Sequence, residues 1–402
     1  MSSQFSPSSG PLGLAIAGIG GFAHVVTDLA LSSLDSSVRL LSVGDPAKPQ
    51  HGDRVRCLEG MGVKVFADFA DALRQSGVEG VWLPVPIGLH RPMCEQAFSQ
   101  GRAVLCEKPL AGCVADADAM IATRDRAGLP AAVGFHDCFD PEVLRLKRRV
   151  LNGELGNLES VSVIASWPRD SAYYQRAAWT GRERFDGNWV RDNPANNALA
   201  HYLMLALFLL GGEDLTAASI SGIEARAFRV RDIETFDTVS ARGRVSGDSP
   251  WFGLPLDVHF THVGEAAIQP QIALRGSKGL WLWKLAANEN DLCQADRVFL
   301  GNPRAREYVL PRFVDLCRGR PQSDRPYATF ETARAHTHAV EQISSSASVA
   351  TVPMSACVKL ESINSGEPRL TWPGLVESMI RAARRGELLP ADPGLVLDNA
   401  SS

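Results

Sequence analysis

The chain has 402 residues, of which 45% are hydrophobic and 21% charged, and its formal net charge is −4. These values are ordinary for a globular protein of two or three domains that buries a large core. They exclude the broad basic field that draws a protein to nucleic acid or to a membrane surface. No apolar run reaches the roughly 18 residues needed to span a bilayer. We therefore expect neither a nucleic-acid partner nor a membrane partner.

Residues 1–10 are polar and rich in serine, and they lack the basic residues that open a signal peptide, so we expect a disordered tail. Eight cysteines occur without a Cys-x-x-Cys pair, which favours reduced, mostly buried thiols in a cytoplasmic protein. No metal site is expected. His259 and His262 fall on opposite faces of a probable strand, and His336 and His338 diverge on a probable helix.

Residues 12–135 alternate short apolar runs with helical stretches. The apolar runs predict buried parallel strands at Leu12–Gly18, Val38–Asp45, Val63–Ala67, Gly80–Pro86, Ala103–Glu107 and Ala131–Phe135. The stretches between them predict helices at Ala23–Leu34, Asp53–Met61, Phe69–Gln75, His90–Gln100 and Val114–Ala127. This alternation is typical of a doubly wound parallel sheet, so the α/β pattern predicts a dinucleotide-binding Rossmann domain over residues 11–136.

After Asp140-Pro141 the pattern changes to that of an α+β domain, which we expect over residues 137–402. Alternation from residue 215 to residue 284 predicts a large, open and mostly antiparallel sheet. An apolar helix is expected at Ala195–Leu210, because Asn193-Pro194 precedes it and Gly211-Gly212 follows it. Further helices are expected at Glu142–Asn152, Thr329–Ser344 and Pro373–Arg385, with strands at Leu158–Ser166 and Val349–Pro353 and a loop over residues 167–192.

A glycine-rich loop follows the first predicted strand. Gly18, Gly20 and Ala23 fit the Gly-x-Gly-x-x-Ala form of the dinucleotide fingerprint. In that motif the first glycine makes a tight turn, the second lets backbone approach the pyrophosphate, and the third position allows close helix–strand packing. The loop therefore predicts a nicotinamide dinucleotide site that includes Gly18, Gly20, Gly21, Phe22 and Ala23.

Asp45 ends the second predicted strand, where an acidic side chain accepts hydrogen bonds from the adenosine ribose and repels a 2′-phosphate. This favours NAD over NADP. Lys48, His51 and Arg54 follow closely, so NADP stays possible. A second interpretation, in which Asp45 only caps a turn, also stays open.

Further candidates lie at the ends of the fourth and fifth predicted strands, where ligands bind in open α/β sheets. Pro84 and Pro86 fix the backbone after the fourth strand. His90, which begins the next helix, either contacts the cofactor or only interacts with that helix terminus. Glu107 and Lys108 follow the fifth strand, and a lysine beside the nicotinamide stabilises a substrate oxyanion during hydride removal.

His201 is the second catalytic candidate, since an imidazole titrates near neutral pH and serves as a general acid or base. It lies in a predicted helix rich in Leu, Ala and Phe, where a buried structural histidine is the alternative. Asn197 lies one helical turn earlier and is the candidate for orienting the ring.

The stretch before that helix is dense in aromatic and guanidinium groups. Aromatic faces suit sugars, and arginines suit carboxylates or phosphates, so the stretch predicts a substrate-binding loop. A packed loop over the sheet is the alternative. The candidates are Trp167, Arg169, Tyr173, Tyr174, Arg176, Trp179 and Arg182.

Together these segments resemble the Gfo/Idh/MocA family of NAD(P)-dependent oxidoreductases, from about Leu12 to Asp392. The resemblance rests on Glu107-Lys108-Pro109, Phe139-Asp140-Pro141, Gly153-Glu154-Leu155-Gly156 and the helix that holds His201. It implies that Lys108 lies near nicotinamide and substrate and that His201 is the catalytic histidine. At Asn197 the chain departs from the many members that carry aspartate four residues before that histidine.

We therefore expect an oxidoreductase that transfers hydride between NAD(P) and a CH–OH group of a sugar, cyclitol or related polyhydroxylated compound. One alternative is an NAD-dependent glycosidase or lyase that oxidises its sugar transiently. Another is a nucleotide-binding sensor without turnover, an interpretation that the missing aspartate keeps open. Since an open sheet face needs cover, a homodimer or homotetramer is also expected.

Overall fold

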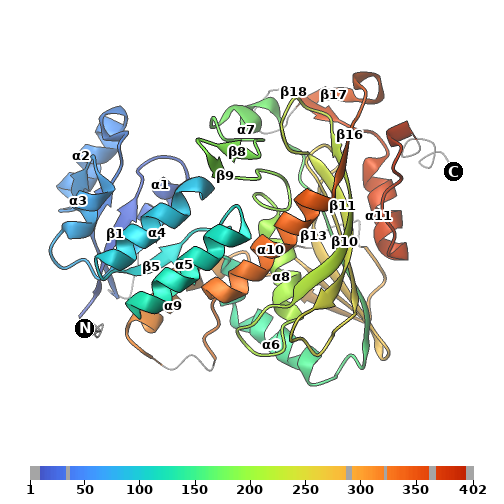
Figure 1. The fold of residues 1–402 in the computed structure, drawn as a ribbon, viewed down its shortest axis with the longest axis horizontal. Coiled ribbons are helices and arrows are strands. Elements are labelled where there is room, and N and C mark those ends of the chain that lie inside the picture. The colour runs from blue at the N-terminus through green and yellow to red at the C-terminus, as the bar shows by residue number, and fades with distance from the viewer. Residues whose placement is uncertain (1–9, 33–36, 287–291, 321–323, 362–367, 395–402) are drawn as a thin grey trace. The chain divides into compact units, whose positions relative to one another are not determined.

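The computed structural model describes residues 10–32, 37–286, 292–320, 324–361 and 368–394 (Figure 1). Its chain forms two compact units. The first holds Met1–Pro141 and Arg304–Arg334, and the second holds Glu142–Pro303 and Ala335–Ser402. The sequence-based boundary lies at residue 136, and residues 304–334 were expected in the second domain. Apart from Gly10, the predicted tail lies outside the described residues.

The first unit is built on a six-stranded parallel sheet with the order β3-β2-β1-β4-β5-β6. The strand order reverses between β1 and β4, as in a Rossmann fold, so the predicted fold class is confirmed. The strands are β1 (Leu12–Ala17), β2 (Val38–Gly44), β3 (Lys64–Phe66), β4 (Gly80–Leu83), β5 (Ala103–Cys106) and β6 (Ala131–Val133). Every residue of β1, β4 and β5 is buried, which explains their continuous apolar sequence.

Helices connect these strands, as the alternating pattern predicts. They are α1 (Phe22–Leu31), α2 (Gly52–Gly60), α3 (Phe69–Arg74), α4 (His90–Ser99) and α5 (Val114–Ala127), with short 3₁₀ turns η1 (Lys48–His51), η2 (Ile87–Leu89) and η3 (His136–Phe139). Asp68 caps α3 by accepting a hydrogen bond from the backbone of Ala70 at 2.8 Å, and Gly128 ends α5 in the left-handed conformation.

Residues 304–334 complete the first unit although they are distant in sequence. This segment holds η4 (Ala305–Tyr308), α9 (Val309–Cys317) and the beginning of α10 (Phe330–Ser346). The sequence pattern does not predict α9. Phe313 of α9 is fully buried and fills the space beside Gly80, where a Cβ would lie 3.1 Å from its ring. Arg318 forms a bidentate pair with Glu79, at 2.9 and 3.1 Å. Burial and charge pairing therefore hold the segment to the parallel sheet.

The second unit holds an eight-stranded sheet with the order β15-β14-β13-β7-β12-β11-β10-β16. Its pairs β7–β12, β10–β16 and β14–β15 are parallel and the other four are antiparallel, so the sheet is mixed. The early strand β7 inserts between two later strands and thereby creates one of the parallel pairs. The strands are β7 (Leu158–Ser166), β10 (Ser219–Arg229), β11 (Thr238–Ser246), β12 (Pro255–Thr261), β13 (Ile268–Gly276), β14 (Gly279–Lys284), β15 (Arg297–Leu300) and β16 (Ser348–Thr351).

Two helices of this unit, α8 (Ala200–Leu209) and α11 (Leu375–Arg385), lie on opposite faces of the sheet (Figure 1). All ten residues of α8 are buried, so it has no polar face. Ser162 of β7 faces α11, since its hydroxyl donates to the carbonyl of Ala383 at 3.1 Å. The smaller elements are α6 (Pro141–Leu151), α7 (Ser171–Gln175), β8 (Arg184–Phe185), β9 (Asn188–Trp189), η5 (Met354–Ala356), β17 (Val358–Glu361) and β18 (Pro368–Thr371).

The start of the apolar helix differs from its prediction. Helix α8 begins at Ala200, and residues 194–199 form turns. The side-chain oxygen of Asn193 does accept hydrogen bonds from the backbones of Ala195 and Asn196, at 3.0 and 3.1 Å. However, the amide of Asn196 donates to the carbonyl of Val190 at 2.9 Å, and such side-chain bonds compete with helical backbone bonds. The predicted loop over residues 167–192 also holds α7 and the β8–β9 hairpin.

Two further observations concern membrane-spanning helices and the pairing of cysteines, each within the described residues. None of the described helices is long and apolar enough to cross a membrane. All eight cysteines fall in the described part of the chain, and each is a free thiol. Five of them are buried, at Cys94, Cys106, Cys113, Cys138 and Cys317.

Candidate nucleotide and substrate sites

The glycine-rich loop joins β1 to the N-terminus of α1. Gly18 has φ +95°, and a Cβ there would lie 3.0 Å from the Cβ of Ala23, so the close packing expected of this pair is present. Gly21 has φ +55° and directly precedes α1, which begins at Phe22. A Cβ on Gly21 would meet nothing within 4 Å. At Gly21 the loop is thus open before the first turn of the helix. The backbone N–H groups of Ala23 and His24 donate to the carbonyls of Gly20 and Gly21, at 3.1 and 3.2 Å.

Asp45 follows β2 and holds two neighbouring loops. Its Oδ2 accepts a hydrogen bond from the backbone of Ile19 in the glycine-rich loop at 2.7 Å. Its Oδ1 accepts one from the backbone of Ala47 at the same distance, as the turn-capping interpretation expects. The expected bond to a ribose stays a prediction.

His90 connects the segments that follow β4 and β5. Its Nε2 lies 2.9 Å from the carbonyl of Val85, and its Nδ1 lies 2.8 Å from that of Pro109 and 3.2 Å from that of Leu110. Burial alone would lower the pKa of His90, but the nearby Cys106 thiol and the carbonyl acceptors outweigh it and raise this pKa. Pro84 and Pro86 lie in the first of these segments. The His90 ring thus contacts both the loop after β4 and the loop after β5, at the carboxyl edge of the sheet.

Glu107 and Lys108 directly follow β5. The Glu107 side chain is buried and accepts a hydrogen bond from the Trp82 indole at 3.0 Å. Burial raises its pKa although Trp82 and Lys108 oppose the shift. Gly134 leaves room for this carboxylate, since a Cβ there would lie 2.7 Å from it. Lys108 itself is half-buried and precedes a cis peptide bond to Pro109.

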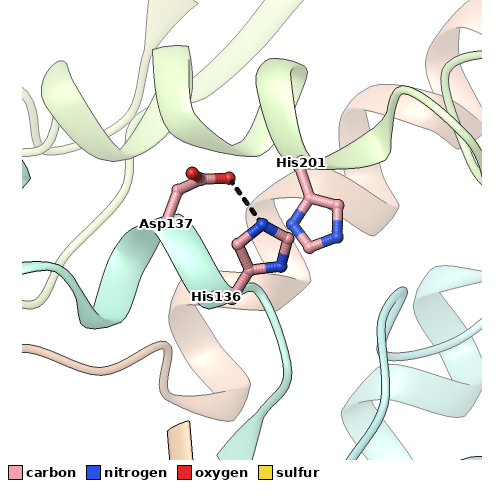
Figure 2. A group of neighbouring side chains, drawn as sticks. All are labelled: His136, Asp137 and His201. Atoms are coloured by element: carbon pink, nitrogen blue, oxygen red, sulfur yellow. Dashed lines mark ion pairs between the residues drawn. The ribbon is translucent and has the colours of Figure 1, made fainter. Parts of the chain in front are cut away.

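Two polar residues after β6 belong to the same edge and were missed. Figure 2 shows the pair of His136 and Asp137, whose Nε2 and Oδ2 atoms lie 3.6 Å apart. Burial, helped by the positive Arg306 and Lys108, lowers the pKa of His136 to about 3. Burial and the neighbouring Asp140 raise the pKa of Asp137 to about 7. Their position after a predicted strand was the signal that marked Lys108, and it applies equally here.

Arg306 of η4 is a third residue near this edge that no sequence motif indicates as a candidate site residue. Its guanidinium lies 5.0 Å from the ring centre of Phe22, within cation–π range. It also lowers the pKa values of both Glu107 and His136. Its position more than 200 residues after the glycine-rich loop gives no local signal.

In the second unit, His201 lies in the first turn of α8 and is buried (Figure 2). Its ring centre lies 6.3 Å from that of Tyr202. Asn197 precedes the helix, and its amide donates a hydrogen bond of 2.6 Å to Asp192. The tertiary structure thus places the buried carboxylate of Asp192 against the amide of Asn197.

The aromatic and basic stretch gathers into one cluster with His262. The guanidinium of Arg176 lies 3.7 Å from the centre of the Tyr173 ring, and that of Arg169 lies 4.7 Å from it. The Tyr174 hydroxyl lies 3.0 Å from Nδ1 of His262. Burial, followed by Arg169, Arg231 and Arg176, lowers the pKa of this histidine well below its usual range, so its ring is neutral.

The other candidates of this stretch have different surroundings. Trp167 donates a hydrogen bond to the side chain of Gln269 at 3.3 Å, and Trp179 lies 5.0 Å from the Arg176 guanidinium. Arg182 is exposed and pairs with Glu234 at 2.7 Å. Most of the stretch is therefore gathered around Tyr173, whereas Arg182 is engaged at the surface.

Residues 12–135 match the model of the oxidoreductase family with an NAD-binding Rossmann fold, Gfo/Idh/MocA. This match covers the strands and helices of the nucleotide-binding unit as far as residue 135. It is 36% identical over 148 residues to inositol 2-dehydrogenase of Streptomyces avermitilis, a match that covers 36% of this chain and 42% of the relative. It is 28% identical over 207 residues to glucose-6-phosphate 3-dehydrogenase of Bacillus subtilis, a match that covers 52% of this chain and 56% of the relative.

A similar fold extends over most of the chain. The WlbA dehydrogenase of Bordetella pertussis, solved with NADH and UDP-GlcNAcA, superposes with a TM-score of 0.68 and 21% identity over 84% of this chain and 96% of that chain. By contrast, the chain spans about half the length of the curated relatives it matches in sequence. The family's NAD-binding Rossmann fold agrees with the predicted cofactor, NAD.

Proposed function

We propose that the protein is an NAD(P)-dependent oxidoreductase that acts on a CH–OH group of a sugar, cyclitol or related polyhydroxylated compound. The observation that carries the proposal is that the open glycine-rich loop and Lys108 follow strands of the same parallel sheet. Carboxyl ends of parallel strands border the ligand crevice of such sheets. The names of two relatives, inositol 2-dehydrogenase and glucose-6-phosphate 3-dehydrogenase, support a polyhydroxylated substrate.

The first unit fits the cofactor. The N–H groups at the start of α1 would bind the pyrophosphate, and Asp45 would accept from the adenosine ribose. When bound, NAD would accept the hydride that leaves the substrate carbon. In the proposed reaction Lys108 stabilises the substrate oxygen by donating a hydrogen bond. His201 accepts the hydroxyl proton, so that the CH–OH group becomes a carbonyl.

The test is the reduction of NAD, and separately of NADP, in the presence of neutral polyols, sugar acids and sugar phosphates. Lys108→Met is expected to lower kcat by roughly 10²- to 10⁴-fold, the usual contribution of a positioned acid or base, while NAD affinity is retained. Arg145→Gln is the matched control, because it removes only an exposed pair with Glu142. Calorimetric binding of NAD without turnover of any substrate would instead support a sensor, and release of an aglycone without net NADH would support a glycosidase or lyase.

We also propose that the protein is a cytoplasmic homodimer or homotetramer. The eight free cysteines support a reducing compartment. The edge strands of the large sheet support self-association, since Val298 and Leu300 of β15 and Val349 of β16 are 49%, 61% and 42% exposed. Light scattering is expected to give a multiple of the chain mass, and a single species near 43.4 kDa would contradict this part of the proposal.

A further inference from the structure

One arginine of the cluster around Tyr173 has no counterion among the residues that the structure describes. The guanidinium of Arg169 lies over the rings of Trp167 and Tyr173, at 5.5 and 4.7 Å from their centres. Within the described part of the chain, its side chain makes no hydrogen bond and no ion pair, and its Nε atom is buried. The residue is half-buried. Its charge is therefore only partly hydrated, and the groups found beside it are the faces of two aromatic rings.

The two neighbouring arginines differ in this respect. A terminal nitrogen of Arg176 lies 3.9 Å from the carboxylate of Asp192, and one of Arg231 lies 3.7 Å from that of Asp237. Arg231 also donates to the backbone carbonyl of Arg169 at 2.5 Å. Two carboxylates thus lie near three guanidinium groups. Arg169 is the arginine without a nearby carboxylate, so the excess positive charge resides on it.

A second polar atom beside Arg169 also lacks a partner. His262 is only 2% exposed, and its Nε2 atom is buried without a hydrogen bond to any part of the chain that the structure describes. Its other ring nitrogen is engaged with Tyr174, and its carbonyl accepts from the backbone of Arg169 at 2.9 Å. Nη1 of the neighbouring Arg231 is also buried without a hydrogen bond among the described residues. Buried polar atoms are normally hydrogen-bonded in folded proteins, so these three neighbouring exceptions point to a missing ligand.

The chemistry of the Arg169 guanidinium limits which kind of ligand fits this position. A guanidinium offers a planar fork of N–H donors and no acceptor, a geometry that matches the two oxygens of a carboxylate or phosphate. A neutral hydroxyl compound would not balance a partly buried positive charge. Aromatic rings beside the guanidinium hold it in plane without neutralising it, because cation–π attraction leaves its N–H groups available.

We propose that Arg169 binds an anionic group, a carboxylate or a phosphate, that the polyhydroxylated substrate carries. This inference rests on the proposed function and narrows its substrate class from neutral polyols to sugar acids or sugar phosphates. The neutral imidazole of His262 beside Arg169 provides one further hydrogen bond through Nε2. Arg169 is then a specificity-determining residue, since it contacts a part of the substrate remote from the oxidised carbon.

The test compares three substrate arms in the full-length protein with NAD: neutral hexoses and cyclitols, hexuronates, and hexose phosphates. Three variants accompany the wild type, namely Arg169→Gln, Arg169→Lys and the surface control Arg145→Gln. We expect one anionic arm to be preferred, and Arg169→Gln to lower its kcat/KM by roughly 10- to 100-fold, mainly through KM. Arg169→Lys should restore part of this loss because it keeps the charge but not the planar fork. Turnover of neutral compounds should change little in either variant.

Calorimetric titration of the same anions into the NAD-bound protein separates this inference from the proposed function. Loss of anion binding in Arg169→Gln supports the inference even if no compound is oxidised. Oxidation of neutral polyols that is insensitive to all three variants would retain the function and overturn the inference, as would anion binding that Arg169→Gln leaves unchanged. Thermal unfolding checks folding. Arg169→Gln should match or exceed the wild-type Tm, and a marked fall would mean that Arg169 is a structural residue.

Discussion

The two units position their polar side chains in different ways. In the nucleotide-binding unit, Asp45, Lys108 and His136 each follow a strand of the parallel sheet within a few residues. In the second unit the corresponding side chains lie on turns, irregular backbone and the helices α7 and α8, and several of their partners are distant in sequence. Tyr174 reaches His262, which lies 88 residues later, and Arg231 reaches the backbone of Arg169, which lies 62 residues earlier.

The difference shows how topology relates sequence position to spatial position. In a parallel sheet every strand ends at the same edge, so a residue's place after its strand is enough to locate it. In a mixed sheet that property is lost. The surroundings of Arg169 depend on how β7, β10 and β12 pair, which no short segment determines. The predictions below test whether the two kinds of site respond differently to substitution.

The largest expected effect concerns Asp137, at the sheet edge of the first unit. Its pKa is raised to about 7 by burial, so the native state keeps a proton that the unfolded chain releases above its ordinary range. Asp137 should therefore contribute a fall of about 4 kcal/mol at most to the free energy of unfolding as pH rises from about 4 to about 7. The lowered pKa of the neighbouring His136 contributes a rise over the same range, so the contribution of Asp137 is the difference between the wild type and Asp137→Asn. Asp137→Asn cannot ionise and should remove this fall. The measurement is urea unfolding at a series of pH values.

Asp53 provides the control for that experiment, because its side chain is 96% exposed. Asp53→Asn should follow the wild-type dependence of stability on pH. If Asp137→Asn also follows the wild-type dependence, burial at this edge does not control the protonation of Asp137.

A smaller effect, roughly 1–3 kcal/mol, is expected for Gly18→Ala. The substitution places a Cβ at φ +95° and 3.0 Å from the Cβ of Ala23, so both backbone strain and crowding oppose it. NAD affinity should fall along with stability, because the loop and the start of α1 would shift together. Gly60→Ala at the end of α2 has open space for its Cβ and should be neutral. Equal thermal stability of the two variants would refute the close packing of this loop.

An effect of similar size is expected at the turn before α8 in the second unit. Asn197→Asp replaces the amide that donates to Asp192 with a second carboxylate, at a cost of about 2 kcal/mol near neutral pH. Two adjacent carboxylates raise one of their pKa values, so the loss should shrink as pH falls below about 5. The exchange Asp192→Asn with Asn197→Asp keeps one amide and one carboxylate and should recover part of the stability. A pH-independent loss would show that charge repulsion is not its cause.

Much of the first unit was predictable, because hydrophobic period and glycine spacing are local. The apolar runs that include Leu12 and Val104 predict buried strands, because strands covered on both faces are apolar throughout. All six predicted strands are present. Segment 304–334 was not predictable by this reasoning. Its α9 joins the sheet through Phe313 and Arg318, and no pattern within the segment indicates a partner more than 200 residues earlier.

The residues of the candidate site also fall into two groups, those that the sequence predicts and those that only the structure reveals. The sequence by itself determined the glycine-rich loop, Asp45 and Lys108, since each is defined by a strand, a turn and the residue that follows. Only the tertiary structure decided that Asp192 lies against Asn197 and that Arg306 covers Phe22. It also decided that Arg169 has no counterion within the described segments. The physical reason is that helical and strand periods arise from contacts between near neighbours. Charge balance and burial instead depend on every segment that packs nearby, and those segments meet only after the chain has folded.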